Sequence, residues 1–203
     1  MSPAPKAMSR ALLPYAPLWN DVAHLVLRWR MLATLYATDQ PTCDILNGAA
    51  PLFSGNLYRT LSDDVYGRIC GLLDPAESGG RDKPCLEALL NALLPHGDQD
   101  LIVSLTDGLA TLRSQAGAIP AWRKAAAHDS GGATALKTMP APQRQTVDAI
   151  VEGIVRLLNE ISARFRAPTI LSPANPVGDD LVAALKKAVK LDEMFRASAG
   201  RKA

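Results

Sequence analysis

The sequence has few of the residues and runs that usually mark chemistry or membrane insertion. Aromatic residues make up 5% of its 203 positions, and there are only three histidines and three cysteines. No apolar run approaches the roughly 18 residues that a membrane helix requires, and the first residues lack the apolar centre of a signal peptide. We therefore expect a cytoplasmic protein that does not bind membranes.

The scarcity of histidine and cysteine also argues against a metal site or a disulfide framework. The histidines are far apart and show no ligand spacing such as HExxH: His24, His96 and His128. His24 lies inside an apolar helical pattern, which favours a structural histidine. The cysteines form no CxxC pair, and their odd number favours reduced thiols, with Cys70 as a small core residue. Glycine-rich phosphate loops and a GxSxG elbow are missing as well, so we expect no metal and no cofactor.

The charge is nearly balanced, at a formal net +2, so bulk charge does not predict a nucleic-acid binder. Two local clusters keep both a functional and a structural interpretation. The Asp63-Asp64 pair suits acid–base work or the exposed face of a helix. Lys186, Lys187 and Lys190 suit phosphate contacts or a solvated face.

The residues that are abundant predict helices. Hydrophobic residues make up 48% of the chain, and alanine and leucine dominate among them. Apolar positions recur at three- and four-residue spacing, whereas runs of β-branched residues are nearly missing. We expect helices over Pro17–Ala37, Thr42–Leu73 with a break or kink at Pro51, Cys85–Leu94, a segment capped by Asp98 and ended by Gly117, Ala121–Asp129 behind Pro120, Gln143–Arg166 and Asp179–Ala197.

These segments predict an all-α fold, an up-and-down helical bundle with additional helices. Thr38-Asp39-Gln40-Pro41 is expected to end the first helix, and loops are expected over 74–84 and 129–142. One domain is expected over residues 15–198, with a core at 15–167 and a C-terminal helix at 179–198. Residues 1–14 and 199–203 are expected to be flexible tails. Whether the last helix belongs to the bundle or serves a partner stays open.

One stretch, Trp122 to Asp129, combines residues suited to chemistry. Arg123 is followed by four residues and then His128, with Asp129 next to it. Histidine exchanges protons near neutral pH, and arginine pairs with phosphate oxygens. The same residues also suit the end of a helix, where cations interact well with free carbonyls. Five helical steps of ~100° place the two side chains ~140° apart.

RNA cleavage by its own 2′-hydroxyl needs a base, a cation at the phosphate and an acid, but no metal. One histidine does not fill all these roles. A two-fold dimer would bring a second Arg123 and a second His128 into one cleft.

At this point the chain resembles the HEPN-domain proteins, which are helical bundles marked by an arginine, four to six residues and a histidine. It is most similar to their abortive-infection branch, in the U-type phage-resistance group. The resemblance covers roughly residues 25 to 130 in the expected order. It includes Trp29-Arg30-Met31-Leu32, Leu35-Tyr36, Ile45-Leu46-Asn47, Ala50-Pro51-Leu52-Phe53, Leu61-Ser62-Asp63-Asp64-Val65-Tyr66, Leu72-Leu73-Asp74-Pro75, Trp122-Arg123-Lys124 and Ala127-His128.

The resemblance implies a metal-independent endoribonuclease that dimerises about its motif helices, in phage defence or in a toxin–antitoxin system with an antitoxin protein as partner. It implies that Arg123 binds phosphate and His128 transfers the proton, with Lys124 and Asp129 in support. In many relatives the arginine lies one position earlier, at the place of Trp122. Many also carry an arginine at the place of Gly71, for which Arg68 is a substitute one turn earlier.

Two other interpretations of the chain remain. One is a non-catalytic helical module that binds nucleic acid, a nucleotide or a partner protein. The other is a structural or regulatory bundle in which Arg123 and His128 only complete a helix.

Overall fold

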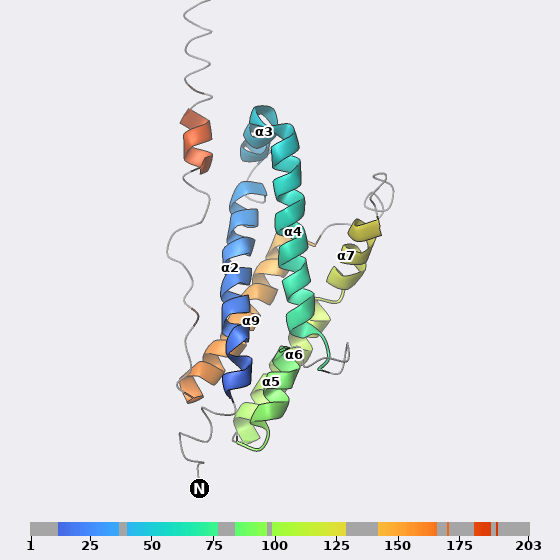
Figure 1. The fold of residues 1–203 in the computed structure, drawn as a ribbon, viewed down its shortest axis with the longest axis vertical. Coiled ribbons are helices and arrows are strands. Elements are labelled where there is room, and N and C mark those ends of the chain that lie inside the picture. Colours follow the sequence, from blue (N-terminus) through green and yellow to red (C-terminus); the bar gives the residue numbers. More distant parts are fainter. Residues whose placement is uncertain are drawn as a thin grey trace, which may run out of the picture. The chain divides into compact units, whose positions relative to one another are not determined.

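A computed structural model describes residues 12–36, 40–76, 84–96, 99–128, 142–165, 170, 181–187 and 190. Every regular element in these ranges is helical, which confirms the all-α expectation (Figure 1). The elements are η1 (Leu13–Tyr15), α2 (Ala16–Tyr36), α3 (Gln40–Ala49), α4 (Pro51–Leu73), α5 (Leu86–Leu93), α6 (Gln99–Gln115), α7 (Ile119–His128) and α9 (Arg144–Phe165), and residues 181–187 are helical as well. None of the helices described is both long and apolar enough to cross a membrane.

The helix ends follow from local chemistry. Pro51 is the first residue of α4, where its missing N–H costs nothing, so the expected break at this proline separates α3 from α4. Cys85 caps α5, and its Sγ accepts a hydrogen bond from the Ala88 N–H. One expectation is wrong: Gln40 and Pro41 begin α3 instead of ending the preceding helix, because proline is tolerated in a first turn. Asp98, Asp129 and most of both expected tails lie outside the described residues.

The chain forms two compact units, whose boundaries fall within α2 and α4. Unit 1 comprises residues 1–26 and 64–172, and unit 2 comprises residues 27–63 and 173–203. The part of the sequence from Trp122 to His128 belongs to unit 1.

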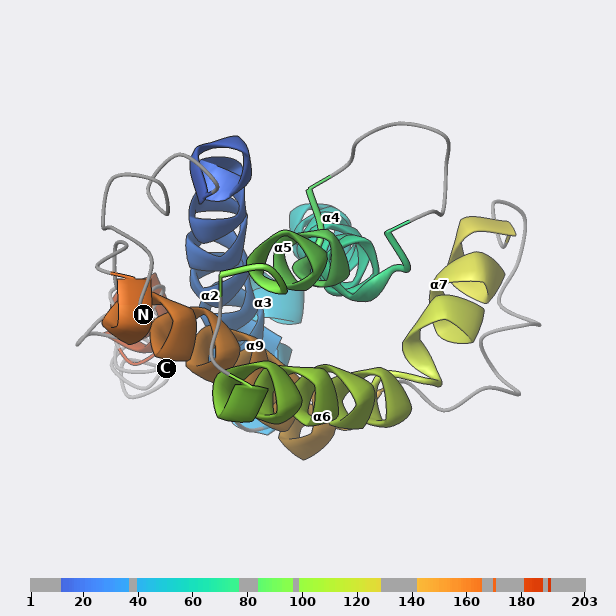
Figure 2. The same ribbon diagram turned by 90° about the horizontal axis from the view of Figure 1, so that it is seen from below.

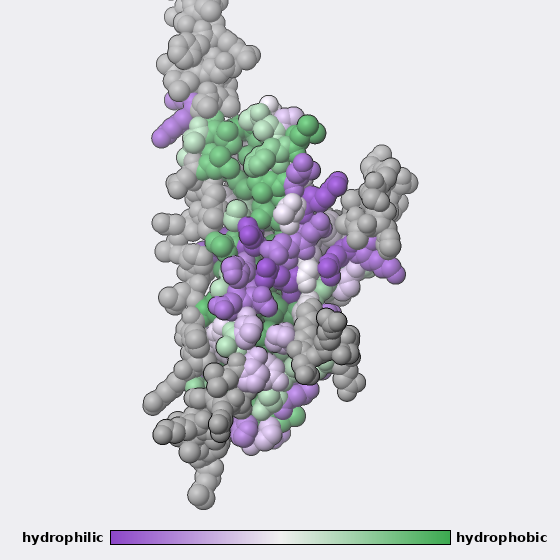
Figure 3. Space-filling view, viewed as in Figure 1, coloured by the Kyte–Doolittle hydropathy of each residue, from purple (hydrophilic) through white to green (hydrophobic). Residues whose placement is uncertain are grey.

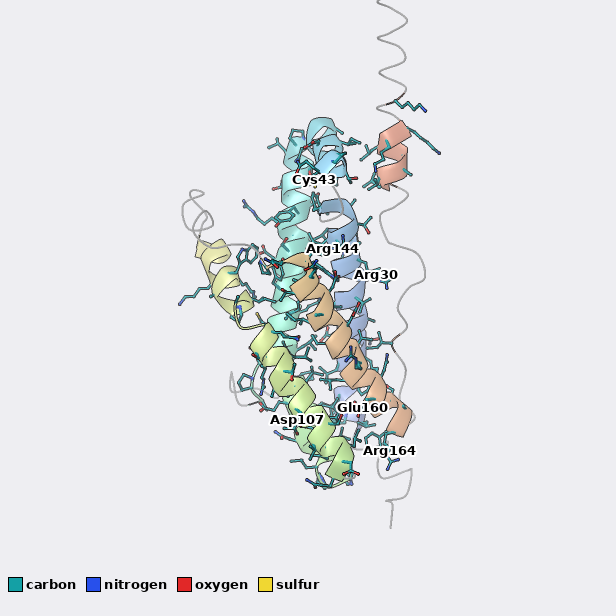
Figure 4. All side chains as sticks on the ribbon, turned by 180° about the vertical axis from the view of Figure 1, so that it is seen from behind. Arg30, Cys43, Asp107, Arg144, Glu160 and Arg164 are labelled. Atoms are coloured by element: carbon teal, nitrogen blue, oxygen red, sulfur yellow. The ribbon has the colours of Figure 1, made fainter. Side chains whose placement is uncertain are left out.

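In unit 1 the helices α6 and α9 lie side by side (Figures 2 and 4). A Cβ added to Gly108 on α6 would lie 2.8 Å from Leu157 Cδ2, and one added to Gly153 on α9 would lie 2.5 Å from Leu112 Cδ2. Each helix therefore offers a glycine to a leucine of the other, and both leucines are buried. This reciprocal arrangement permits a close approach that any larger residue at either glycine would obstruct.

The first part of α2 packs on α9 through a buried polar contact. Trp19 Nε1 donates a hydrogen bond of 2.9 Å to Ser162 Oγ, which in turn donates to the Leu158 carbonyl. Further along, the Asn159 side chain makes two hydrogen bonds to the backbone of Ile170 and holds that residue against α9. The core of unit 1 is thus built from apolar stripes with few polar groups, and among its described residues the buried Trp122 Nε1 has no hydrogen-bond partner.

In unit 2 the end of α2 and the junction of α3 with α4 are tied together. The Tyr36 hydroxyl donates to the Ser54 carbonyl at 2.8 Å, and the buried Ser54 hydroxyl donates to Asn47 Oδ1 at 3.1 Å. The Tyr58 ring packs edge-on against the Tyr36 ring. The helical residues 181–187 lie against α3, where Val182 and Leu185 line the same hollow as Thr42, Ile45 and Leu46.

Candidate functional site

Helix α7, which carries the Arg123 and His128 positions, lies beside α4 (Figure 1) and contacts it through Trp122 and Tyr66. The rings of Trp122 and Tyr66 meet edge-on, with centroids 4.8 Å apart, and both side chains are buried. Such aromatic pairs contribute beyond the area that they bury. Trp122 is therefore an anchor of α7 on α4.

Arg123 follows Trp122 and lies along the same face of α4. A Cβ added to Gly67 would lie 3.6 Å from Arg123 Nη2 and 3.7 Å from Cζ, so the guanidinium passes directly over this glycine. The Arg123 side chain also makes a hydrogen bond with the thiol of Cys70, one turn after Gly67. Arg123 remains an exposed residue. Gly67 and Cys70 thus fix the position of the Arg123 guanidinium.

Burial and the charge of Arg123 have the two largest effects on the pKa of the Cys70 thiol, and they act in opposite directions. Burial raises the pKa of the Cys70 thiol above its ordinary value, because a thiolate is costly in an apolar setting, while the positive charge of Arg123 acts in the other direction. The net direction is upward, so this cysteine is a neutral thiol at neutral pH. Cys70 is half-buried. The expectation of a small core residue is only partly met, since one side of it faces an arginine.

Lys124 and His128 are the other motif positions within α7. Lys124 is exposed, and among the described residues no carboxylate forms an ion pair with either Lys124 or Arg123. His128 is the last residue of α7. On an ideal helix its position lies ~140° around the axis and ~7.5 Å along it from Arg123, but only ~40° from Lys124. By register, position 128 shares a face of α7 with Lys124, not with Arg123.

Arg68 and the acidic pair have structural partners. Arg68 donates to Asp21 at 3.0 Å and to Asp64 at 3.0 Å, joining the first part of α2 to α4. Arg68 is thus engaged by two carboxylates. Of the acidic pair, Asp64 serves this ion pair and Asp63 is exposed.

The other histidines lie apart from α7 in the sequence and differ from expectation. His24 is exposed on α2, so the interpretation as a structural histidine within an apolar pattern is wrong. The reason is that His24 falls between the buried positions Val22 and Leu25 on the outer side of the helix. His96 is partly exposed after α5. The part of the chain that the structure describes holds no group of three or more side chains suited to bind a metal ion.

Arg113, in the last turn of α6, joins this helix to the end of α4 and to α5. Its Nε donates to the Leu73 carbonyl at 2.8 Å and its Nη2 to the Asp74 carbonyl at 3.2 Å, at the end of α4. Its Nη1 pairs with Glu87 of α5 at 3.1 Å, and Glu87 also accepts the Ala76 N–H. The ends of α4 and α6 are therefore joined where α7 starts.

The sequence did not indicate the platform under Arg123. Tyr66 and Cys70 are four residues apart and Gly67 lies beside them, so they share a face of α4, which is the signal that could have suggested it. Comparison of the chain with protein-family models, with curated proteins and with solved structures gives no match.

Proposed function

We propose that this protein is an endoribonuclease of the HEPN type, which cleaves RNA by attack of a 2′-hydroxyl on the adjacent phosphate and needs no metal. Its biological setting would be phage defence or a toxin–antitoxin system, with an antitoxin protein as partner. The observation that carries the proposal is Arg123, an exposed guanidinium held at a fixed place on α4. A cation fixed in this way is suited to bind a phosphate.

The chemistry assigns a separate task to each residue. A neutral His128 removes the proton from the 2′-hydroxyl, whose oxygen then attacks phosphorus. Arg123 stabilises the charge that builds on the phosphorane oxygens. A protonated histidine gives its proton to the 5′-oxygen as the P–O5′ bond breaks. The products are a 2′,3′-cyclic phosphate and a 5′-hydroxyl. Lys124 contributes a second positive charge, and Asp129 orients His128.

Two copies of the chain complete this machinery. Within one copy, the positions of Arg123 and His128 lie on different faces of α7, so one α7 does not offer both to the same phosphate. A two-fold axis at α7 lets the Arg123 of one copy and the His128 of the other face the same RNA, and supplies a second histidine as the acid.

The test is cleavage of a random-sequence RNA pool by the purified protein in excess chelator. We expect products that end in 2′,3′-cyclic phosphate. His128→Ala should lower the rate by about 100-fold or more, which is the range for loss of a general acid or base. Arg123→Ala should also lower it strongly.

Two matched variants control for nonspecific damage. His96→Ala removes a partly exposed histidine and Arg156→Ala an exposed arginine on α9, and both should cleave at the wild-type rate. If His128→Ala cleaves as fast as wild type, or if no cyclic phosphate forms, the proposal is wrong.

A second function has one observation in its favour. The contacts of the Arg123 guanidinium with Gly67 and Cys70 commit part of its donors to its own chain, and Trp122 is buried where the relatives have an arginine. A non-catalytic module that binds nucleic acid or a nucleotide needs only the remaining donors. Binding of RNA without turnover, weakened by Arg123→Ala and unaffected by His128→Ala, distinguishes this function from the nuclease. If RNA and nucleotides do not bind at all, only a protein partner remains.

A further inference from the structure

The two units of the chain carry different formal charges. Unit 1 contains 13 lysine and arginine residues and 13 aspartate and glutamate residues, whereas unit 2 contains 9 and 7, so the net charge of +2 belongs to unit 2. The excess is larger in the part of unit 2 that the structure describes, which has six cationic side chains and two carboxylates. A polyanion such as RNA is therefore attracted by the net charge of unit 2, and unit 1 adds no net attraction.

Three of the six cations belong to one segment. Lys186 and Lys187 lie in the helical residues 181–187, Lys190 is helical as well, and all three are exposed. On an ideal helix position 190 lies ~40° around the axis and ~6 Å along it from position 186, and ~60° around the axis from position 187. The three lysines therefore share one side of the segment, and we call them the lysine face.

The opposite side of this segment is held by α3. Val182 and Leu185 line the same hollow as three residues of α3, of which Thr42 and Leu46 are buried. On an ideal helix Leu185 lies ~100° from Lys186 and ~140° from Lys190. Figure 3 shows the hydrophilic surface of this segment on the side away from the hydrophobic surface of α3. The backbone that carries the lysine face is thus ordered before any ligand binds, which lowers the entropic cost of binding.

The charge of the lysine face is not compensated nearby. From residue 181 to residue 191 the sequence has no acidic residue, and among the described residues no carboxylate forms an ion pair with any of the three lysines. The junction of α3 and α4 offers phosphate no such partner, since residues 45–58 include no charged side chain and Leu52 and Phe53 are exposed there. Within unit 2, a phosphate chain therefore finds clustered cations on the helical segment.

The lysine face fits a nucleic acid better than an anionic membrane. A basic amphipathic helix binds a membrane by placing its apolar side among the lipids as well as by its charge. Here Val182 and Leu185 of the apolar side already lie against α3. Phosphates of a nucleic-acid backbone require only the cations, because they are exposed along the strand and bind lysine through charge.

We propose that the lysine face binds the phosphate backbone of RNA and contributes affinity for the substrate, while Arg123 and His128 act on the phosphate that is cleaved. The identification of RNA as the substrate rests on the proposed nuclease function, whereas the lysine face adds a second contact surface, in unit 2. Contacts with phosphate do not depend on the base sequence, so the lysine face binds RNA strands of different sequence equally.

The test is fluorescence anisotropy of the full chain with a labelled single-stranded 2′-O-methyl RNA, which has no 2′-hydroxyl and is not cleaved. Replacing the three lysines together by glutamine, which keeps the helix propensity, should weaken binding by about tenfold or more at low salt. The slope of the logarithm of the binding constant against the logarithm of the salt concentration should become smaller by about 2, because each lost phosphate contact contributes about 0.7.

A matched control removes the same formal charge from unit 1. Arg144, Arg156 and Arg164 are exposed on α9, and their joint replacement by glutamine should leave the salt slope unchanged. Circular dichroism checks that both triple variants are folded. In the cleavage assay, the lysine variant should raise KM and leave kcat unchanged, because the lysine face does not contact the phosphate that is cleaved.

Two results would overturn the proposal: a salt slope that the lysine variant leaves unchanged, or equal reductions in both triple variants, which would show that net charge alone attracts RNA. Lysine-dependent binding to phosphatidylserine vesicles without binding to RNA would also overturn it and assign the lysine face to a membrane. Lysine-dependent RNA binding without any cleavage would refute the nuclease and support the lysine face. Cleavage that His128→Ala abolishes and the lysine variant leaves unchanged in KM would do the reverse.

Discussion

At the scale of single residues, Arg123 and Cys70 affect each other: the thiol helps to fix the position of the guanidinium, and the guanidinium lowers the pKa of the thiol. The guanidinium hydrogen-bonds the thiol and lies over Gly67, so the direction of the arginine depends on two residues of another helix. The charge state of the thiol depends in turn on the arginine. The pKa of Cys70 therefore reports on the position of Arg123, and measuring it requires no enzymatic activity.

Replacing Arg123 by methionine should raise the pKa of Cys70 further. Burial already raises the pKa of this thiol, and Arg123 partly offsets that effect through its charge and its hydrogen bond, so removal of the guanidinium takes away the largest opposing contribution. Methionine is unbranched and uncharged, so it removes the charge while it retains the aliphatic part of the side chain. The midpoint of Cys70 alkylation against pH, followed peptide by peptide with mass spectrometry, should move upward.

Lys124→Met serves as the matched control, because Lys124 is the next residue of α7 and its side chain is exposed. Its Cys70 profile should coincide with that of wild type. An Arg123→Met profile that also coincides with wild type would mean that the arginine does not stand at the thiol in solution.

The carboxylate of Glu87 ties part of the stability of unit 1 to pH. Hydrogen bonds from Arg113 and then from the Ala76 N–H hold the pKa of Glu87 below its ordinary value. A lowered pKa in the folded state means that this stabilisation is present above the pKa of an unfolded glutamate, about 4.3, and is lost as the pH falls through the lower, folded value.

Glu87→Gln should therefore make the free energy of unfolding less dependent on pH below about 4.3, the pKa of an unfolded glutamate. Urea unfolding of wild type and variant at pH 7 and through the acidic range measures this, with the exposed Glu152→Gln on α9 as control. Wild-type and Glu87→Gln curves that stay parallel down to low pH would contradict the assignment.

At the scale of helices, the contact of α6 with α9 depends on two reciprocal glycine–leucine pairs. Gly153→Ala should destabilise the protein by about 1–2 kcal/mol, because crowding against Leu112 outweighs the gain in helix propensity. Urea unfolding provides the number.

A double variant decides whether Leu112 is the cause. Leu112→Val shortens the side chain that the new methyl meets, so Gly153→Ala together with Leu112→Val should cost less than the sum of the two single changes. Strictly additive costs would indicate that the glycine matters for another reason.

Helix-scale features divide into those that the sequence predicts and those that it does not. The three- and four-residue periodicity predicts α2 and α9 to within a residue or two, and Pro51 predicts the break between α3 and α4. Gly108 and Gly153 carry no such signal, since a glycine within a helical pattern only weakens it. Their role becomes visible when two helices distant in the sequence meet.

The same holds for the candidate site. The motif on α7 can be recognised in the sequence, because the chain has only three histidines and one of them, His128, follows Arg123 after four residues. The platform of Gly67 and Cys70 cannot be recognised in the sequence, because it depends on the packing of α7 against α4 through Trp122. Arg68 shows the opposite error: a cation that looked available is held by Asp21 and Asp64.

At the scale of the whole molecule, the chain combines two units with different surfaces. Unit 1 holds the exposed Arg123 and Lys124, and unit 2 holds the uncharged junction of α3 and α4. The single domain expected over residues 15–198 stays a prediction. Composition alone gave the class of fold, since alanine and leucine at this abundance favour helices, but it did not locate either surface.

The exposed side chains at the start of α4 have a consequence for temperature. Leu52 is 85% exposed and Phe53 62%. Contact through nonpolar surface is driven largely by the entropy of water near 25 °C and weakens on cooling. Any contact that buries these two side chains therefore loses strength when the protein is chilled.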